Sequence, residues 1–138
     1  MIDIIIQGQP VRITEQQHRF GGYSKKNGKA IIYRNKSLKA AYTHMIQALA
    51  EYAPAVPISG PVMLEVDWCF GTKDKKKLTN SYKTTRPDTD NLIKGLKDCL
   101  TKCGFWVDDS QVCIEILIKS WCPLKDAHTR IQISELNG

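Results

Sequence analysis

The sequence predicts an α+β fold: a single compact domain with two helices packed on a mixed β-sheet. Three observations predict this class. Short apolar or strictly alternating segments, typical of strands, occur at the start, in the middle and near the end of the chain, and two other segments repeat apolar residues at helical spacing. No internal repeat divides the 138 residues, and a chain of this length can bury about two-thirds of its unfolded surface. We therefore predict one domain over residues 1–138.

The elements expected in the amino-terminal half are a strand, a basic loop, a short strand and a helix. The apolar run over residues 1–6 predicts the first strand. Glycine, proline and asparagine then mark a long loop, and residues 29–34 are predicted as a short strand after an Asn-Gly turn. Apolar residues recur at helical spacing from Ser37, a predicted N-cap, until Pro54, which predicts an amphipathic helix over this stretch.

The carboxyl-terminal half begins with a half-buried strand, predicted by strict alternation over residues 62–70. The lysine-rich residues 71–86 lack the apolar content of a core segment and are predicted as a mobile, solvated loop. A second amphipathic helix is expected to begin just after Pro87 and to end at Gly104.

Two further strands complete the predicted sheet. Apolar residues alternate over residues 112–118 and again over residues 129–136. Because only a short loop separates them, we expect the last strand to pair antiparallel with its predecessor in sequence.

Cysteine and histidine usage favours neither a disulfide framework nor a zinc ribbon. The five cysteines are odd in number and form no Cys-x-x-Cys pair, so we interpret them as buried thiols in a reducing cytosol. The three histidines, His18, His44 and His128, have no mutual spacing typical of a metal site, and none is predicted. The apolar run at the amino terminus is too short for a signal peptide or a membrane span, so we expect a soluble, cytoplasmic protein without an organic cofactor.

The net charge of +6 is distributed unevenly along the chain. Residues 12–39 contain eight basic residues against one acid, and residues 71–86 contain six against one. Residues 88–109 reverse this balance, with five aspartates against three lysines. An acidic centre flanked by basic segments predicts contact with phosphates. The residues expected to contact DNA are Arg12, Arg19, Lys25, Lys26, Lys73, Lys75, Lys76, Lys77 and Arg86.

The acidic residues have the spacing of a possible magnesium site. Asp88 and Asp90 lie at the start of the second predicted helix, and Asp109 precedes the following strand. Carboxylate oxygens and water are the ligands that Mg²⁺ prefers, and such a cation can activate water and offset charge on a phosphate. Lys94 lies one helical turn after Asp90, where its ammonium could pair with a carboxylate or stabilise a phosphate under attack.

A simpler interpretation of these residues stays open. Aspartates at a helix start complement the helix dipole and cap free amides, and the Asp108-Asp109 pair is ordinary turn chemistry. Within that pair, Asp108 is predicted as the turn residue. Phe105 and Trp106 are expected to fill the core below this turn, although aromatic residues can also stack on bases.

Two segments resemble the signature of the RusA family of phage and prophage Holliday-junction resolvases: Arg86-Pro-Asp-Thr-Asp-Asn-Leu-Ile-Lys94 and Gly104-Phe-Trp-Val-Asp-Asp-Ser-Gln-Val112. The resemblance is close over about residues 86–112. It implies a RusA-like fold in which Asp88, Asp90 and Asp109 are the catalytic metal-binding residues and Lys94 is the catalytic lysine. It also implies a homodimer, which suits the two symmetric nicks of a four-way junction. The amino-terminal loop departs from the family's proline- and asparagine-rich segment.

The predicted function is therefore a structure-selective endonuclease that resolves Holliday junctions in DNA recombination and repair. It would hydrolyse phosphodiesters with Mg²⁺, for which Mn²⁺ is the expected substitute. A non-catalytic basic DNA-binding module is the main alternative, and a protein-interaction domain is a third. A binding module would not need Mg²⁺, whereas weak, salt-insensitive affinity for DNA would favour the third function.

Overall fold

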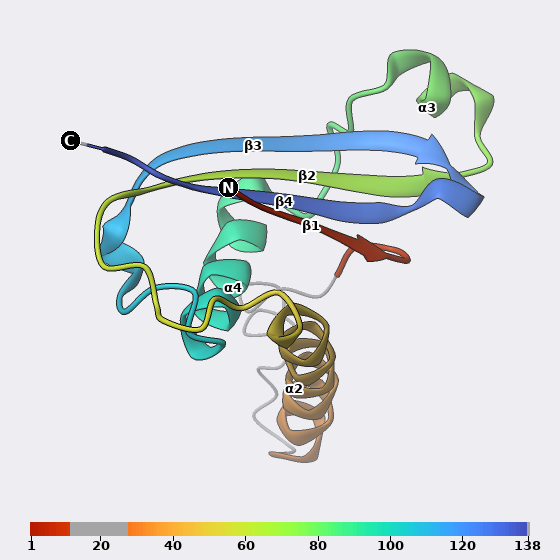
Figure 1. Cartoon of the computed structure of the whole chain (residues 1–138). Helices are drawn as coiled ribbons and strands as arrows, with labels where there is room; N and C mark the ends of the chain where they lie inside the picture. The colour runs from red at the N-terminus through yellow and green to blue at the C-terminus, as the bar shows by residue number, and fades with distance from the viewer. Residues whose placement is uncertain (12–27, 138) are drawn as a thin grey trace.

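The computed structural model describes residues 1–11 and 28–137, with the side chains of residues 28–37 excepted. In this part of the chain, one four-stranded mixed sheet carries two long helices on the same side (Figure 1), which confirms the predicted α+β class. The helices and strands are β1 (Ile2–Gln7), α2 (Gly28–Ala50), β2 (Val62–Thr72), α3 (Lys75–Asn80), α4 (Thr89–Lys102), β3 (Val112–Pro123) and β4 (His128–Glu135). Two short 3₁₀ helices, η1 (Asp109–Gln111) and η2 (Leu124–Asp126), flank β3.

The strand order is β1-β4-β2-β3, and it corrects the predicted pairing of the last strand. β4 pairs antiparallel with β1 and β2 rather than with β3, while β2 and β3 pair in parallel. The inner position lets β4 bury Thr129, Ile131 and Ile133, whereas β3 lies at the sheet edge and leaves Ile114 and Ile116 exposed. Burial of apolar area therefore outweighs the short connection from β3 to β4.

Helix α2 corrects the prediction of a short strand over residues 29–34. The helix begins at Gly28, so Ser37 lies inside it and is not its N-cap. Six residues of mixed apolar and polar character match a strand as well as they match a helix, and no proline interrupts the segment before Pro54. The helix ends at Ala50, as expected from that proline.

Part of the lysine-rich segment is ordered, which corrects the predicted mobile loop over residues 71–86. Helix α3 starts after Asp74, whose carboxylate accepts a hydrogen bond from the backbone of Lys76 at 2.9 Å. Lys83 is buried, and its ammonium lies 4.3 Å from the ring centroid of Trp121 and 5.0 Å from that of Phe70. Cation–π contacts and a hydrogen bond to Thr85 at 2.6 Å stabilise a residue that the charge pattern places in solvent.

The hydrophobic core lies between the sheet and the two long helices. Alternate residues of β2, from Val62 to Phe70, are buried on the helical face, as the alternation predicts. Helix α4 buries Leu92, Ile93, Gly95, Leu96, Cys99 and Leu100. A Cβ atom at Gly95 would approach the Tyr42 ring atom Cζ to 2.9 Å, so a larger residue there would have to displace the Tyr42 side chain where α2 packs on α4.

The opposite face of the sheet has no helix over it in the described part of the chain (Figure 1). Its strands present polar side chains, among them Glu65, Asp67, Arg130 and Gln132, which line one shallow pocket. Arg130 also pairs with Asp3 of β1, with 2.9 Å between guanidinium and carboxylate. No helix among the described residues has the length and apolar content needed to cross a membrane.

Candidate active site

Asp88 and Asp90 lie at the amino-terminal end of α4, as predicted. Asp88 occupies the N-cap position in an extended conformation, but its side chain makes no capping hydrogen bond, and Asp90 lies in the first turn. Both residues are exposed, and neither carboxylate hydrogen-bonds a group in the described part of the chain. The capping interpretation therefore fails for Asp88, since its oxygens are available for another ligand.

The segment before Asp88 is held in place by a lysine that the sequence did not single out. The ammonium of Lys119 on β3 donates to the backbone carbonyls of Thr85 and Pro87, at 2.9 and 2.8 Å. The backbone of Lys83 donates in turn to the carbonyl of Lys119 at 3.0 Å. These bonds fix the start of α4 against the carboxyl-terminal half of β3. The sequence alone does not indicate this role of Lys119, because the residue becomes a neighbour of Thr85 and Pro87 only when the two segments pack together.

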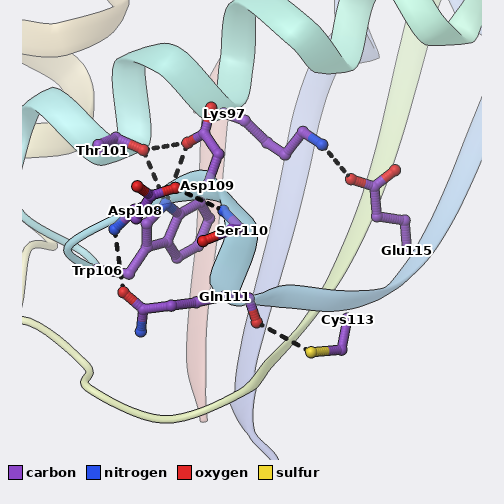
Figure 2. Close-up of polar contacts among 9 residues, drawn as sticks. All are labelled: Lys97, Thr101, Trp106, Asp108, Asp109, Ser110, Gln111, Cys113 and Glu115. Atoms are coloured by element: carbon purple, nitrogen blue, oxygen red, sulfur yellow. Dashed lines mark hydrogen bonds and ion pairs between the residues drawn. The ribbon is translucent and has the colours of Figure 1, made fainter.

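Lys94 is exposed on α4 one turn after Asp90, so its side chain shares the face of that carboxylate. The same face continues through Lys97 to Thr101 near the end of the helix. Lys97 pairs with Glu115 of β3, with 2.6 Å between ammonium and carboxylate (Figure 2). The face thus carries Asp90 at one end and two lysines in its middle.

Asp109 lies at the other end of α4 (Figure 2). The hydroxyl of Thr101 donates a short hydrogen bond to Oδ1 of Asp109, and the indole Nε1 of Trp106 approaches the same oxygen at 3.3 Å. Trp106 also donates to the Thr101 hydroxyl at 2.8 Å. Within the described residues these bonds use Oδ1 only, which leaves Oδ2 outside the network.

The turn around Asp109 is fixed by a capping box. Asp108 accepts a hydrogen bond from the backbone of Ser110, which lowers the pKa of its carboxyl group, and it caps η1. Gln111 accepts from the backbones of Val107 and Asp108 and donates to the carbonyls of residues 58 and 60. Asp108 is therefore the turn residue that the sequence predicts.

The aromatic pair before this turn is part of the core. Phe105 and Trp106 are fully or almost fully buried, which confirms the prediction for both. Trp106 has a second contact that the prediction missed, because its indole nitrogen hydrogen-bonds the Thr101 and Asp109 pair.

The three aspartates do not meet within one chain. Thr101, which holds Asp109, follows Asp90 by eleven residues of helix, a separation of about 16 Å along the helix axis. Two oxygens that bind the same Mg²⁺ lie within about 4 Å of each other, because each bond is about 2.1 Å long. Among the described residues, the group whose ligand atoms come close enough to share a metal ion does not include these aspartates. A single chain therefore places two of the expected ligands at one site and the third at another.

The predicted DNA-contacting residues are placed in part. Lys73, Lys75 and Lys76 are exposed on and before α3, and Arg86 is exposed just before Asp88. The Lys77 ammonium lies 4.7 Å from the ring centroid of Trp121. Because Lys83 and Lys119 connect this region to the start of α4, its positive charge lies at the same edge of the sheet as the acid pair. Arg12, Arg19, Lys25 and Lys26 lie outside the described residues.

Comparison with known proteins gives the family. The model of the family described as endodeoxyribonuclease RusA matches residues 9–134, which is most of the chain. The chain belongs to the RusA endodeoxyribonuclease family. Membership covers α2 and all elements from β2 to the last residues of β4, so it extends well beyond the two segments that first suggested it.

Two similar proteins differ in how much of the chain they match. The crossover junction endodeoxyribonuclease rusA of Lactococcus phage r1t is 44% identical over 52 residues, which are 38% of this chain and only 39% of the phage protein. The uncharacterized protein YqaN of Bacillus subtilis (strain 168) is 33% identical over 123 residues, with 80% of this chain and 81% of the relative covered.

Proposed function

We propose that this RusA family protein is a structure-selective endonuclease that resolves four-way DNA junctions with the help of a divalent cation. The observation that carries the proposal is the exposed, uncapped carboxylate pair of Asp88 and Asp90, set at the same sheet edge as a basic helix. An acid pair beside a phosphate-binding surface is unfavourable unless a cation lies between carboxylates and phosphate. The name of the phage relative supports the same activity and substrate.

The residues at the start of α4 fit Mg²⁺. Their donors are carboxylate oxygens only, both groups are exposed to water, and no described hydrogen bond competes for them. When bound, the cation would supply an activated water and positive charge opposite the scissile phosphate, and Mn²⁺ should substitute for it. Lys94 would contribute a fixed positive charge one turn away. The basic side chains of α3 and Arg86 would hold the DNA backbone and position it without reading sequence.

The third carboxylate, we propose, comes from a second copy of the chain. Each chain carries both halves of the ligand set, Asp88 and Asp90 at one end of α4 and Asp109 at the other. A two-fold dimer that places the start of one α4 beside the end of the other completes two sites at once. Two sites related by a two-fold axis also match the two symmetric cuts that a four-way junction requires. Sedimentation of the protein without metal should accordingly show a dimer.

Incubation of the purified protein with a synthetic four-way junction, with Mg²⁺ or with a chelator, tests the function. We expect paired nicks with 5′-phosphate ends in Mg²⁺, none in the chelator, and little cleavage of a linear duplex built from the same arms. Binding that tightens as salt falls, without cleavage in Mg²⁺ or Mn²⁺, would instead identify a non-catalytic DNA-binding module.

A further inference from the structure

Two cysteines and a histidine come together on the sheet face opposite the helices. Sγ of Cys69, Sγ of Cys122 and a ring nitrogen of His128 all lie within 4.8 Å of one another. Both cysteines are buried and His128 is partly buried. The spacing of residues along the sequence does not reveal this group, because its members come together across strands.

The sheet register brings the three residues together. Cys69 on β2 pairs directly with His128 on β4, and Gly71, two residues further along β2, pairs with Cys122 on β3. Residues two apart on a strand share a face, so Cys122 lies diagonally across from Cys69 on that face. The buried Ala127 belongs to the same small cluster of buried residues as the two cysteines. The three side chains thus belong to three adjacent strands of the sheet, β4, β2 and β3.

The histidine ring is held by its own backbone. Its Nδ1 lies 2.7 Å from the carbonyl oxygen of Asp126, which can only accept a hydrogen bond. In a neutral imidazole, donation from Nδ1 leaves the lone pair of Nε2 available to a metal ion. A backbone carbonyl in this role is the usual partner of a histidine that binds a metal, because it sets both the tautomer and the ring orientation.

We propose that Cys69, Cys122 and His128 form a binding site for a thiophilic divalent cation, of which Zn²⁺ is the first candidate. Two thiolates and one neutral imidazole are a common ligand set for Zn²⁺, with water in the fourth position, whereas Mg²⁺ avoids sulfur. Binding releases one proton from each thiol to the solvent, so that the two thiolate charges balance the cation. The ion would link β2, β3 and β4 through Cys69, Cys122 and His128, and so stabilise the folded state relative to the unfolded state.

This site is independent of the proposed nuclease site. By strand register its residues lie on the sheet face opposite the core residues that pack on α4, and its donors are sulfur and nitrogen instead of carboxylate oxygen. A sulfur-to-metal charge-transfer band therefore reports on this site alone, whatever the fate of the junction-cleavage proposal.

The test is a Co²⁺ titration of the full-length, reduced and metal-free protein, followed by displacement with Zn²⁺. The matched control is Cys113→Ser, because Cys113 is exposed on β3, away from the other two cysteines, and its thiol donates a hydrogen bond to the carbonyl of Gln111 at 3.4 Å. We expect wild type and Cys113→Ser to bind one ion with intense sulfur-to-cobalt absorption in the near ultraviolet. Cys122→Ser should lose most of that absorption.

His128→Gln keeps the test informative if a buried cysteine variant misfolds, since His128 is only partly buried. We expect this variant to keep sulfur-to-cobalt absorption but to bind Zn²⁺ at least about 100-fold more weakly, because it has lost one of three ligands. Equal Zn²⁺ affinity of wild type and His128→Gln would overturn the proposal. So would the absence of sulfur-to-cobalt absorption in wild type, or a Cys69 to Cys122 disulfide that forms in air while no metal is taken up.

Discussion

The two ends of α4 present aspartates in opposite situations. At the amino-terminal end, Asp88 holds the capping position without capping, and both Asp88 and Asp90 are exposed. At the carboxyl-terminal end, Asp108 caps η1 and Asp109 accepts hydrogen bonds from Thr101 and Trp106. Both carboxylates at the amino-terminal end are thus available to bind a ligand, whereas at the carboxyl-terminal end only Oδ2 of Asp109 lies outside the described hydrogen bonds. Hydrogen-bond partners, and not residue type, therefore distinguish Asp108, which caps η1, from the three aspartates that keep oxygens outside the described hydrogen bonds.

The largest effect on junction cleavage is expected at the amino-terminal end of α4. Asp88→Asn or Asp90→Asn should reduce junction cleavage by about 10²–10³ or more, because the carboxamide keeps the shape but loses the charge that holds the cation. Junction binding and thermal stability should remain unchanged, since neither carboxylate supports described structure.

Asp98→Asn is the matched control for that experiment, because it removes the same charge from the same helix. Asp98 is exposed and pairs only with Lys102 at 3.1 Å in the described structure, an interaction that raises the pKa of Lys102. Cleavage by Asp98→Asn should match wild type. Cleavage that falls equally in Asp98→Asn and Asp88→Asn would show that general charge, and not a site at the start of α4, controls activity.

Lys94→Ala sharpens the comparison, since the lysine stands between the two ends but nearer the acid pair. Its charge is expected to act on the phosphate as negative charge grows in the transition state, so turnover should fall by about 10²–10³. Junction affinity should change far less. Single-turnover rates at saturating protein isolate the chemical step. A variant within about threefold of wild type would leave Lys94 with a structural role only.

The basic helix beside the acid pair should contribute to binding and not to chemistry. Replacement of Lys73, Lys75 and Lys76 by alanine removes three exposed charges while the Lys77 contact with Trp121 stays intact. The slope of log affinity against log salt should flatten by roughly one unit per lost phosphate contact, for branched and linear DNA alike. An unchanged slope would mean that α3 does not touch DNA.

The smallest effect, a loss of stability, is expected from the hydrogen bonds at the carboxyl-terminal end of α4. Thr101→Val removes the hydroxyl that joins Trp106 to Asp109 while it keeps the side-chain shape. The free energy of unfolding should fall by about 1–2 kcal/mol, because the indole N–H loses its nearer acceptor. Chemical denaturation measures this loss. Unchanged stability would show that the Thr101, Trp106 and Asp109 network does not hold the turn.

The elements that could be predicted are those with long, unambiguous periodicity. The alternation of β2 and the apolar face of α4 determine which residues are buried, and both agree with the structure. Residues 29–34 were too few to separate a strand from a helix, and the position of β4 depends on burial in the whole sheet. Local patterns carry no information on such long-range choices.

The candidate site shows the same limit. The local pattern places Asp88, Asp90 and Lys94 correctly at the start of one helix. It does not place Asp109, because a family signature gives no distances. The length of α4 gives the missing distance: its fourteen residues place the acid pair at one end about 20 Å from the turn at the other end. The Cys69, Cys122 and His128 group was likewise invisible, since only strand register brings those residues together.

The central claim is that one active site combines Asp88 and Asp90 of one chain with Asp109 of a second, and subunit mixing tests it most directly. Asp90→Asn and Asp109→Asn proteins should each be inactive on a four-way junction in Mg²⁺. In a mixed dimer, both substitutions fall in one site and the other site is complete, so the mixture should regain nicking of one strand without full resolution. Mass spectrometry confirms that subunits have exchanged. A mixture that contains mixed dimers yet stays as inactive as its two parents would contradict the shared site.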